Sequence, residues 1–241
     1  MELTNMETNM EPNEMKTETF SLGGRDCAAY ACPGADMLLI QPMDGRELSL
    51  LPEEAAAISE RTGGPFILSA FRVSDWNREL SPWEAPPVFG KEGFGNGAGE
   101  TLRWLLKEGI PGLLSRFSLP ENAPVIFGGY SLAGLFALYC AYESNRFSAV
   151  AAASPSVWFP GWIPWAKGRE CQAGFVSLSL GDREEKTRNP VMAKVGECIR
   201  RQYELLPESR RHLEWNEGNH FKEPEIRTAK AFARCLEVFL R

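Results

Sequence analysis

The sequence predicts an α/β fold with a mostly parallel central sheet, because short apolar segments alternate with segments of helical composition. Residues 123–129 are apolar on both faces and bounded by Pro and Gly, which is typical of a central strand in a parallel sheet. Residues 132–144 follow directly as an apolar helical segment. The 241 residues contain no internal repeat and no Gly/Ser linker, so we expect one domain with helices on both faces of the sheet.

The other elements follow from apolar runs of strand length and from apolar residues at helical spacing. Strands are expected at 37–42, 65–71, 123–129, 147–153, 174–180 and 212–217, with one more within 18–32. Helices are expected at 52–61, about 98–109, 132–144, 189–205 and 224–240. Strands separated by helices imply parallel pairing through right-handed crossovers. In the last helix, Ile226, Phe232 and Leu236 share one face, which predicts packing on the sheet.

Residues 1–17 differ from the rest of the chain, because they are polar, mostly acidic and without aromatic side chains. Such a segment buries too little apolar surface to fold, so we expect it to be disordered. It also lacks the basic start and apolar core of a secretory signal. The folded domain is then expected to span 18–241, with no large separate cap domain.

Charge and hydropathy exclude several classes of partner. The net charge is −6 and the isoelectric point is near 5.2, and no Lys/Arg cluster outweighs the surrounding acids. This argues against a nucleic-acid or anionic-membrane surface. The most apolar long region, 149–165, is interrupted by prolines and is too short to span a bilayer. The expected partner is a small molecule.

Cysteine and histidine usage argues against a metal or a cofactor. The six cysteines are scattered without a C-x-x-C pair, and the chain has two histidines. A disulfide framework, a zinc site or another metal centre is therefore not expected, and a reducing cytoplasm is the expected compartment. No glycine-rich phosphate loop of the Walker type is present.

The most informative motif is Gly129-Tyr130-Ser131-Leu132-Ala133-Gly134, between the expected strand and helix. The chain must turn from strand to helix within about one residue, which places Ser131 at the apex in a strained conformation. Gly129 and Ala133 leave room for the two elements to close on each other. The motif predicts a nucleophile elbow, with the Leu132 N–H at the helix N-terminus placed to bind an oxyanion. Chance occurrence of small residues around a serine is the alternative.

A serine nucleophile needs a base, and the two histidines have different settings. His220 lies in a Gly/Asn loop between an expected strand and the last helix, so it is the expected base. A loop or capping role is its alternative. His212 lies at the entry of a strand and is expected to be a surface imidazole.

The carboxylate that orients the base is expected just after the strand 174–180. Asp182, Glu184 and Glu185 follow Gly181 there. A side chain three residues past the turn glycine can fold back toward the histidine loop, so Glu184 is the first choice and Asp182 the alternative, with Glu185 third. All three could instead be solvated or lie at the N-terminus of the next helix.

The order serine, acid, histidine is that of α/β-hydrolases. From about residue 20 to the C-terminus the chain resembles that superfamily, and more closely its cap-less esterase D and enterochelin esterase branch. The shared motifs are the elbow, the run Ser154-Pro155-Ser156 with following aromatics, Gly181 to Glu184, and Asn219-His220. The resemblance implies a serine hydrolase of esters, in a branch that also contains acyltransferases and members with a weak or absent acid.

A second oxyanion donor normally comes from the loop after an early strand. Here that loop is Met43-Asp44-Gly45, so the N–H of Met43 or Asp44 is the candidate. The segment departs from the His-Gly loop of many lipases. A simple turn joining two strands is an equal alternative.

Four tryptophans are candidates for substrate walls. Trp76 and Trp83 follow one expected strand, and Trp158 and Trp162 follow the strand after the elbow. Loops at the carboxyl ends of strands form the ligand-binding edge of open α/β sheets. Closure of the core beneath long loops is the alternative for each ring.

Together these features predict a serine carboxylesterase that acts through an acyl-enzyme on a small-molecule ester. An acyltransferase or thioesterase with the same triad is one alternative. A catalytically inactive binding module on the same fold is another.

Overall fold

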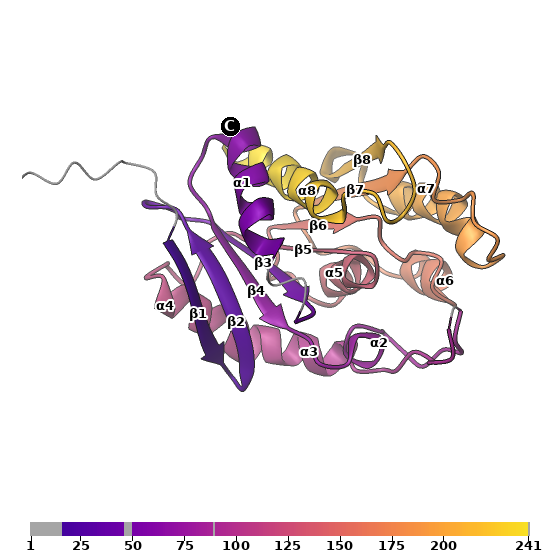
Figure 1. Ribbon diagram of the computed structural model, residues 1–241, viewed down its shortest axis with the longest axis horizontal. Coiled ribbons are helices and arrows are strands. Elements are labelled where there is room, and N and C mark those ends of the chain that lie inside the picture. Colours follow the sequence, from indigo (N-terminus) through magenta and orange to yellow (C-terminus); the bar gives the residue numbers. More distant parts are fainter. Residues whose placement is uncertain (1–15, 46–49, 89, 241) are drawn as a thin grey trace, which may run out of the picture.

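The computed structural model describes residues 16–45, 50–88 and 90–240, and within them eight strands form a single sheet (Figure 1). The strands lie in the order β1-β2-β4-β3-β5-β6-β7-β8. Their bounds are β1 Lys16–Leu22, β2 Arg25–Ala31, β3 Leu38–Met43, β4 Ile67–Arg72, β5 Val125–Tyr130, β6 Ala149–Ala153, β7 Phe175–Gly181 and β8 Arg211–Asn216. From β4 to β8 across the sheet all neighbours are parallel, which confirms the predicted mostly parallel sheet.

The N-terminal edge of the sheet is an antiparallel hairpin rather than the one strand expected within 18–32. Strand β1 pairs with β2, and β2 pairs antiparallel with β4. Gly23 and Gly24 both have positive φ, the turn conformation that glycine adopts at least cost. Strand β1 begins at Lys16, two residues before the expected start of the folded domain at 18. The rest of the segment expected to be disordered, residues 1–15, lies outside the described residues.

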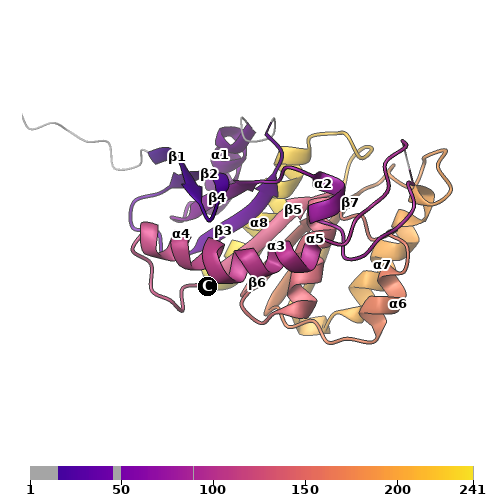
Figure 2. The ribbon, with the colours of Figure 1, turned by 90° about the horizontal axis from the view of Figure 1, so that it is seen from below.

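Helices cover both faces of the sheet (Figures 1 and 2). On one face lie α1 Leu51–Thr62 and α8 Pro224–Phe239, which pack against each other. On the other face lie α3 Ala98–Trp104, α4 Ile110–Arg116, α5 Leu132–Glu143, α6 Trp162–Lys167 and α7 Val195–Leu205. Short pieces complete the chain: α2 Trp76–Glu79, the π-helical turn Leu105–Gly109, and the 3₁₀ turns Met192–Lys194 and Glu208–Arg210. No helix within the described residues is long and apolar enough to cross a membrane.

Three helical segments differ from expectation. The helix expected at 189–205 begins at Val195, after the 3₁₀ turn Met192–Lys194. The helix expected to end at 109 continues through a π-helical turn into α4, whose second residue is Pro111. Helix α6 forms in the tryptophan-rich segment that was expected to be a loop. Its apolar side is buried, so tertiary packing overrides the weak helical signal of the prolines around it.

The sheet separates two apolar cores. Strand β5 contributes to both, because Val125 and Phe127 face the core under α3 to α7 while Ile126 faces the core under α1 and α8. All three side chains are completely buried. This confirms the prediction of a central strand at 123–129, and it gives the residue that follows β5 a rigid support on both sides.

His212 on β8 is half-buried rather than a surface imidazole, and its Nδ1 is buried without a hydrogen-bond partner among the described residues. Burial, and then the nearby Arg234 charge, lower the pKa of His212 below its usual value. In the unfolded chain the same imidazole takes up a proton near its ordinary pKa of about 6.5. The unfolded state therefore binds more protons below that pH, and acid favours unfolding.

We expect His212→Gln to flatten the decline of the melting temperature between about pH 7.5 and pH 5, because the variant has no imidazole to protonate on unfolding. Thermal unfolding followed by circular dichroism at several pH values measures this. If the melting temperatures of the wild type and the variant fall equally between these pH values, His212 is not responsible for the decline.

Candidate active site

Ser131 forms the single-residue connection between β5 and α5. Its backbone has φ 57° and ψ −117°, a conformation that is strained for a residue with a side chain. Helix α5 begins at the next residue, as the sequence predicts. At Gly129, a Cβ would lie 2.6 Å from the Cβ of Ala133, closer than real side-chain contacts allow. The bend thus requires glycine two residues before the serine, and it holds the hydroxyl at the carboxyl edge of the sheet.

Three side chains from three strand ends meet at this edge. The Oγ of Ser131 lies 3.0 Å from Nε2 of His220, and Nδ1 of His220 lies 2.7 Å from Oε2 of Glu184. His220 comes from the loop after β8, and Glu184 follows β7. The Glu184 side chain is 3% exposed and that of His220 is 21% exposed, so the acid is buried while the imidazole reaches the surface. The structure thus brings together Ser131, His220 and Glu184.

The other two acids near Gly181 have different partners. The Oδ1 of Asp182 accepts a hydrogen bond of 2.7 Å from the backbone N–H of Gly218, which ties the acid loop to the histidine loop. Glu185 is exposed and lies 3.9 Å from Arg200. Of the three acids, Glu184 alone contacts the imidazole.

Glu184 is held by donors that the sequence did not indicate. Its Oε1 accepts from the Ser154 hydroxyl at 2.7 Å, from the Gly181 N–H at 2.8 Å and from Arg227 at 3.0 Å. Arg227 is buried in the first turn of α8. A cation in the first turn of a helix is unfavourable, because the helix dipole is positive there. This unusual position is the one feature of the sequence that could have pointed to Arg227.

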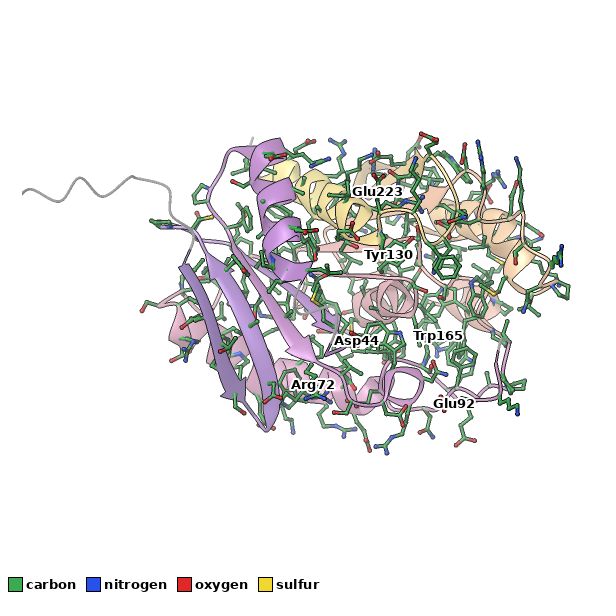
Figure 3. All side chains as sticks on the ribbon, in the orientation of Figure 1. Asp44, Arg72, Glu92, Tyr130, Trp165 and Glu223 are labelled. Atoms are coloured by element: carbon green, nitrogen blue, oxygen red, sulfur yellow. The ribbon has the colours of Figure 1, made fainter. Side chains whose placement is uncertain are left out.

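Tyr130 and Ser156 complete the surroundings of the pair Ser131 and His220. The Tyr130 hydroxyl donates a hydrogen bond of 2.6 Å to the backbone carbonyl of His220, and burial raises the pKa of Tyr130 to about 12, so the hydroxyl stays a donor. The Oγ of Ser156 lies 3.3 Å from that of Ser131. Figure 3 shows Tyr130 between Asp44 and Glu223, which lie beside β3 and α8 at the same edge.

The oxyanion donors expected from the sequence lie beside one pocket. Leu132 is the first residue of α5, and an N–H in this position has no acceptor within the helix. Met43 ends β3, and its carbonyl accepts from the N–H of Val73. Met43, Tyr130 and Ala133 line the same pocket. The roles of the Leu132, Met43 and Asp44 N–H groups stay predictions.

Trp76 is the one candidate wall tryptophan that lines this pocket. Leu50 and Pro224 line it as well. Trp162 is completely buried and its indole N–H donates to Gln202 at 2.8 Å, so its assignment as a substrate wall is wrong. It faces the core because α6 rather than a loop carries it.

Trp83 and Trp158 lie in the aromatic packing beyond the pocket. The Trp83 ring stacks on Trp162 and its N–H donates to the Pro160 carbonyl at 2.8 Å. Trp158 is 9% exposed and packs edge-on against Phe94. Neither ring is brought to the pocket beside Ser131, and contact of either with a substrate stays a prediction.

The described residues offer no group of three or more His, Cys, Asp or Glu side chains able to hold a metal ion. All six cysteines are free thiols. Burial raises the pKa of the Cys27 thiol to about 11 and that of Cys235 still further, which keeps both thiols protonated.

The sequence matches no protein-family model and no curated protein. Among solved structures, the chain is similar to an IroE-like serine hydrolase from Shewanella oneidensis, with a TM-score of 0.72 and 17% identity over 92% of this chain and 79% of that one. It is similar to siderophore hydrolase EstB from Aspergillus nidulans, with a TM-score of 0.67 and 19% identity over 95% of both chains.

A third similar structure is the enterobactin esterase FES from Shigella flexneri in the presence of enterobactin. Its TM-score is 0.66 and its identity 15%, over 94% of this chain and 60% of that one. These likenesses show the fold. The protein therefore has the α/β fold of these hydrolases, which confirms the fold that the sequence resemblance implied.

We expect Glu184→Gln to lower kcat for an ester substrate by as much as about 10⁴-fold, because an amide at this position can hold the wrong imidazole tautomer. Asp182→Asn keeps an acceptor oxygen for the Gly218 N–H, and Glu185→Gln removes an exposed charge, so both should change kcat little. Steady-state kinetics of the three variants decide this. Small and equal losses in all three would indicate a Ser131/His220 dyad, and a dominant loss in Asp182→Asn would move the orienting role to Asp182.

Proposed function

We propose that this protein is a serine hydrolase that cleaves small-molecule carboxylic esters through an acyl-enzyme. The observation that carries the proposal is the continuous contact from Ser131 through His220 to Glu184 at a strained strand-to-helix turn. A hydroxyl, an imidazole and a buried carboxylate in this order are the groups that acyl transfer requires.

In the proposed reaction, Ser131 Oγ attacks the ester carbonyl while Nε2 of His220 takes the serine proton. Glu184 accepts a hydrogen bond from Nδ1 and stabilises the imidazolium that forms. The N–H of Leu132 and a second N–H from Met43 or Asp44 bind the oxyanion of the tetrahedral intermediate. His220 then protonates the leaving alcohol, and water attacks the acyl-Ser131 ester by the same steps in reverse.

The similar structures favour esters as substrates, because they include a siderophore hydrolase and an enterobactin esterase. The pocket that Tyr130 and Ala133 line next to the elbow has an apolar part formed with Met43, Leu50 and Trp76, which suits an apolar or flat acyl or alcohol group. Its polar lining residues are Gln41, Glu54, Glu225 and Thr228. A reducing cytoplasm is the proposed compartment, because six free thiols are typical of it.

Acyltransferase or thioesterase activity would use the same acyl-enzyme. Competition among water, an alcohol and a thiol as acceptors, with the products separated by chromatography, distinguishes these activities. An inactive binding module on this fold is less well supported, because all three groups of the relay are in contact.

A fluorophosphonate probe is expected to label Ser131 stoichiometrically, since a serine hydroxyl activated by an adjacent base displaces fluoride from phosphorus far faster than an ordinary hydroxyl does. Mass spectrometry of the labelled peptide locates the adduct. Ser131→Ala should abolish labelling and hydrolysis of p-nitrophenyl esters while the melting temperature is retained. An adduct on another serine, such as Ser154, or no adduct on the folded protein, would refute the proposed function.

We expect Trp76→Ala to raise KM for aromatic or medium-chain esters more than for acetate esters, because the lost ring removes apolar surface worth roughly 25 cal/mol per Å² from the pocket. Trp215→Ala is the matched control, since that ring is 42% exposed on the edge strand and packs on Arg200. An equal change of KM for both classes of ester in Trp76→Ala would show that the ring does not contact the substrate.

A further inference from the structure

Arg227 is a buried cation that contacts the acid of the proposed catalytic relay, the loop that carries the histidine and the residue before the nucleophile. The residue is 2% exposed. It lies on α8, whereas the relay residues follow strands. One nitrogen lies 3.0 Å from Oε1 of Glu184, 3.3 Å from the Tyr130 hydroxyl and 3.4 Å from the Ser154 hydroxyl. The other donates to the backbone carbonyl of Glu217 at 2.9 Å.

These contacts divide the two oxygens of Glu184 between two tasks. Oε1 receives Arg227, Ser154 and the Gly181 N–H, while Oε2 lies toward Nδ1 of His220. The three donors on Oε1 fix the plane of the carboxylate. They leave the second oxygen for the imidazole.

The same cation also holds the histidine loop. It binds the Glu217 carbonyl at the start of the loop and contacts the Tyr130 hydroxyl, which donates to the His220 carbonyl. A planar guanidinium can bind all of these acceptors at once, which the point charge of a lysine cannot do.

We propose that Arg227 is a positioning residue for ester hydrolysis: it fixes the buried Glu184 carboxylate and the histidine loop so that His220 faces Ser131. The proposal rests on the proposed function. A buried carboxylate left without an ion-pair partner is strongly destabilising, and Arg227 supplies that partner at 3.0 Å. Of the titratable groups, Glu184 and Tyr130 contact the guanidinium directly. The Glu217 side chain pairs with Lys222 at 3.3 Å, and Asp182 accepts from the Gly218 N–H.

A double-variant cycle tests whether Arg227 acts through Glu184. Arg227→Met is expected to lower kcat/KM for p-nitrophenyl butyrate by about 10–100-fold, the size typical for losing a group that orients a catalytic residue and less than the ~10⁴-fold that loss of the orienting acid itself can cost. In the Glu184→Gln background the same substitution should cost less than about threefold, because residues that act as a unit have non-additive effects. Full multiplicative losses in the double variant would overturn the proposal.

The pH profile separates positioning from a merely structural role. Removing a cation beside the Glu184–His220 pair lets the pair hold a proton more strongly, so the acidic limb of kcat/KM should move to higher pH in Arg227→Met. Arg227→Lys keeps the charge and should leave the limb in place while kcat falls. An unshifted limb in Arg227→Met would overturn the proposal.

Folding and the proposed chemistry are checked separately. Arg234→Met is the matched control on α8, because the half-buried Arg234 pairs with Glu237 and not with any residue of the relay. This substitution should leave kcat/KM unchanged. If Arg227→Met does not fold, Arg227→Lys and the double variant, which leaves no unpaired buried carboxylate, still decide the outcome. If the wild type shows neither hydrolysis nor fluorophosphonate labelling, the proposed function fails. Wild-type activity combined with an unaffected Arg227→Met refutes the positioning role alone.

Discussion

The turn at Ser131 is the constraint on which the rest of the site depends. Strand β5 and helix α5 meet with one residue between them, and that residue has a strained positive φ. Such a conformation costs on the order of 1–3 kcal/mol and persists only where packing enforces it. Here β5 is buried on both faces and α5 is buried along most of its length, so the two elements cannot separate to relax the turn. The small residues Gly129 and Ala133 are the local condition for this close approach.

Sheet order then decides which groups can reach the serine. Strands β6, β7 and β8 follow β5 on one side, so Ser154, Glu184 and His220 approach from that side. Strand β3 lies on the other side of β5 and brings Met43 to the pocket. The acid and base therefore converge on one side of the nucleophile and the candidate oxyanion loop on the other. In the proposed reaction this separation lets proton transfer and oxyanion binding act on opposite sides of the bound carbonyl.

The sequence predicted those features that local chemistry determines. Apolar runs located the central strands, and the small residues around Ser131 located the turn. The spacing of Glu184 from Gly181 identified the acid that contacts His220, because a turn glycine fixes where the third residue points. Features that depend on contacts between distant segments were missed. Arg227 and Glu184 are 43 residues apart in the sequence, and no local pattern predicts their contact.

Trp162 illustrates the opposite error. Its position after a strand end predicts a substrate wall. Helix α6 instead directs the ring into the core, where the indole N–H donates to Oε1 of Gln202. The ring stacks with Trp83 and Trp165 and closes the core beneath the long loops. Aromatic composition alone therefore could not distinguish a wall from a core residue, since both need large apolar side chains near the strand ends.

The length of the Glu184 side chain explains why a glutamate rather than an aspartate contacts the imidazole. Asp182, directly after Gly181, points across to the Gly218 N–H and braces the histidine loop. Glu184 follows the turn and folds back so that one oxygen binds the N–H of Gly181 itself. An aspartate there would be one methylene shorter and could not keep that contact and reach His220 together. The buried carboxylate in turn needs a cation, because breaking a buried ion pair typically costs about 3–5 kcal/mol. Glu184 therefore depends on two supports, the turn at Gly181 and the Arg227 cation. Together they hold a carboxylate inside the protein with one oxygen facing the imidazole.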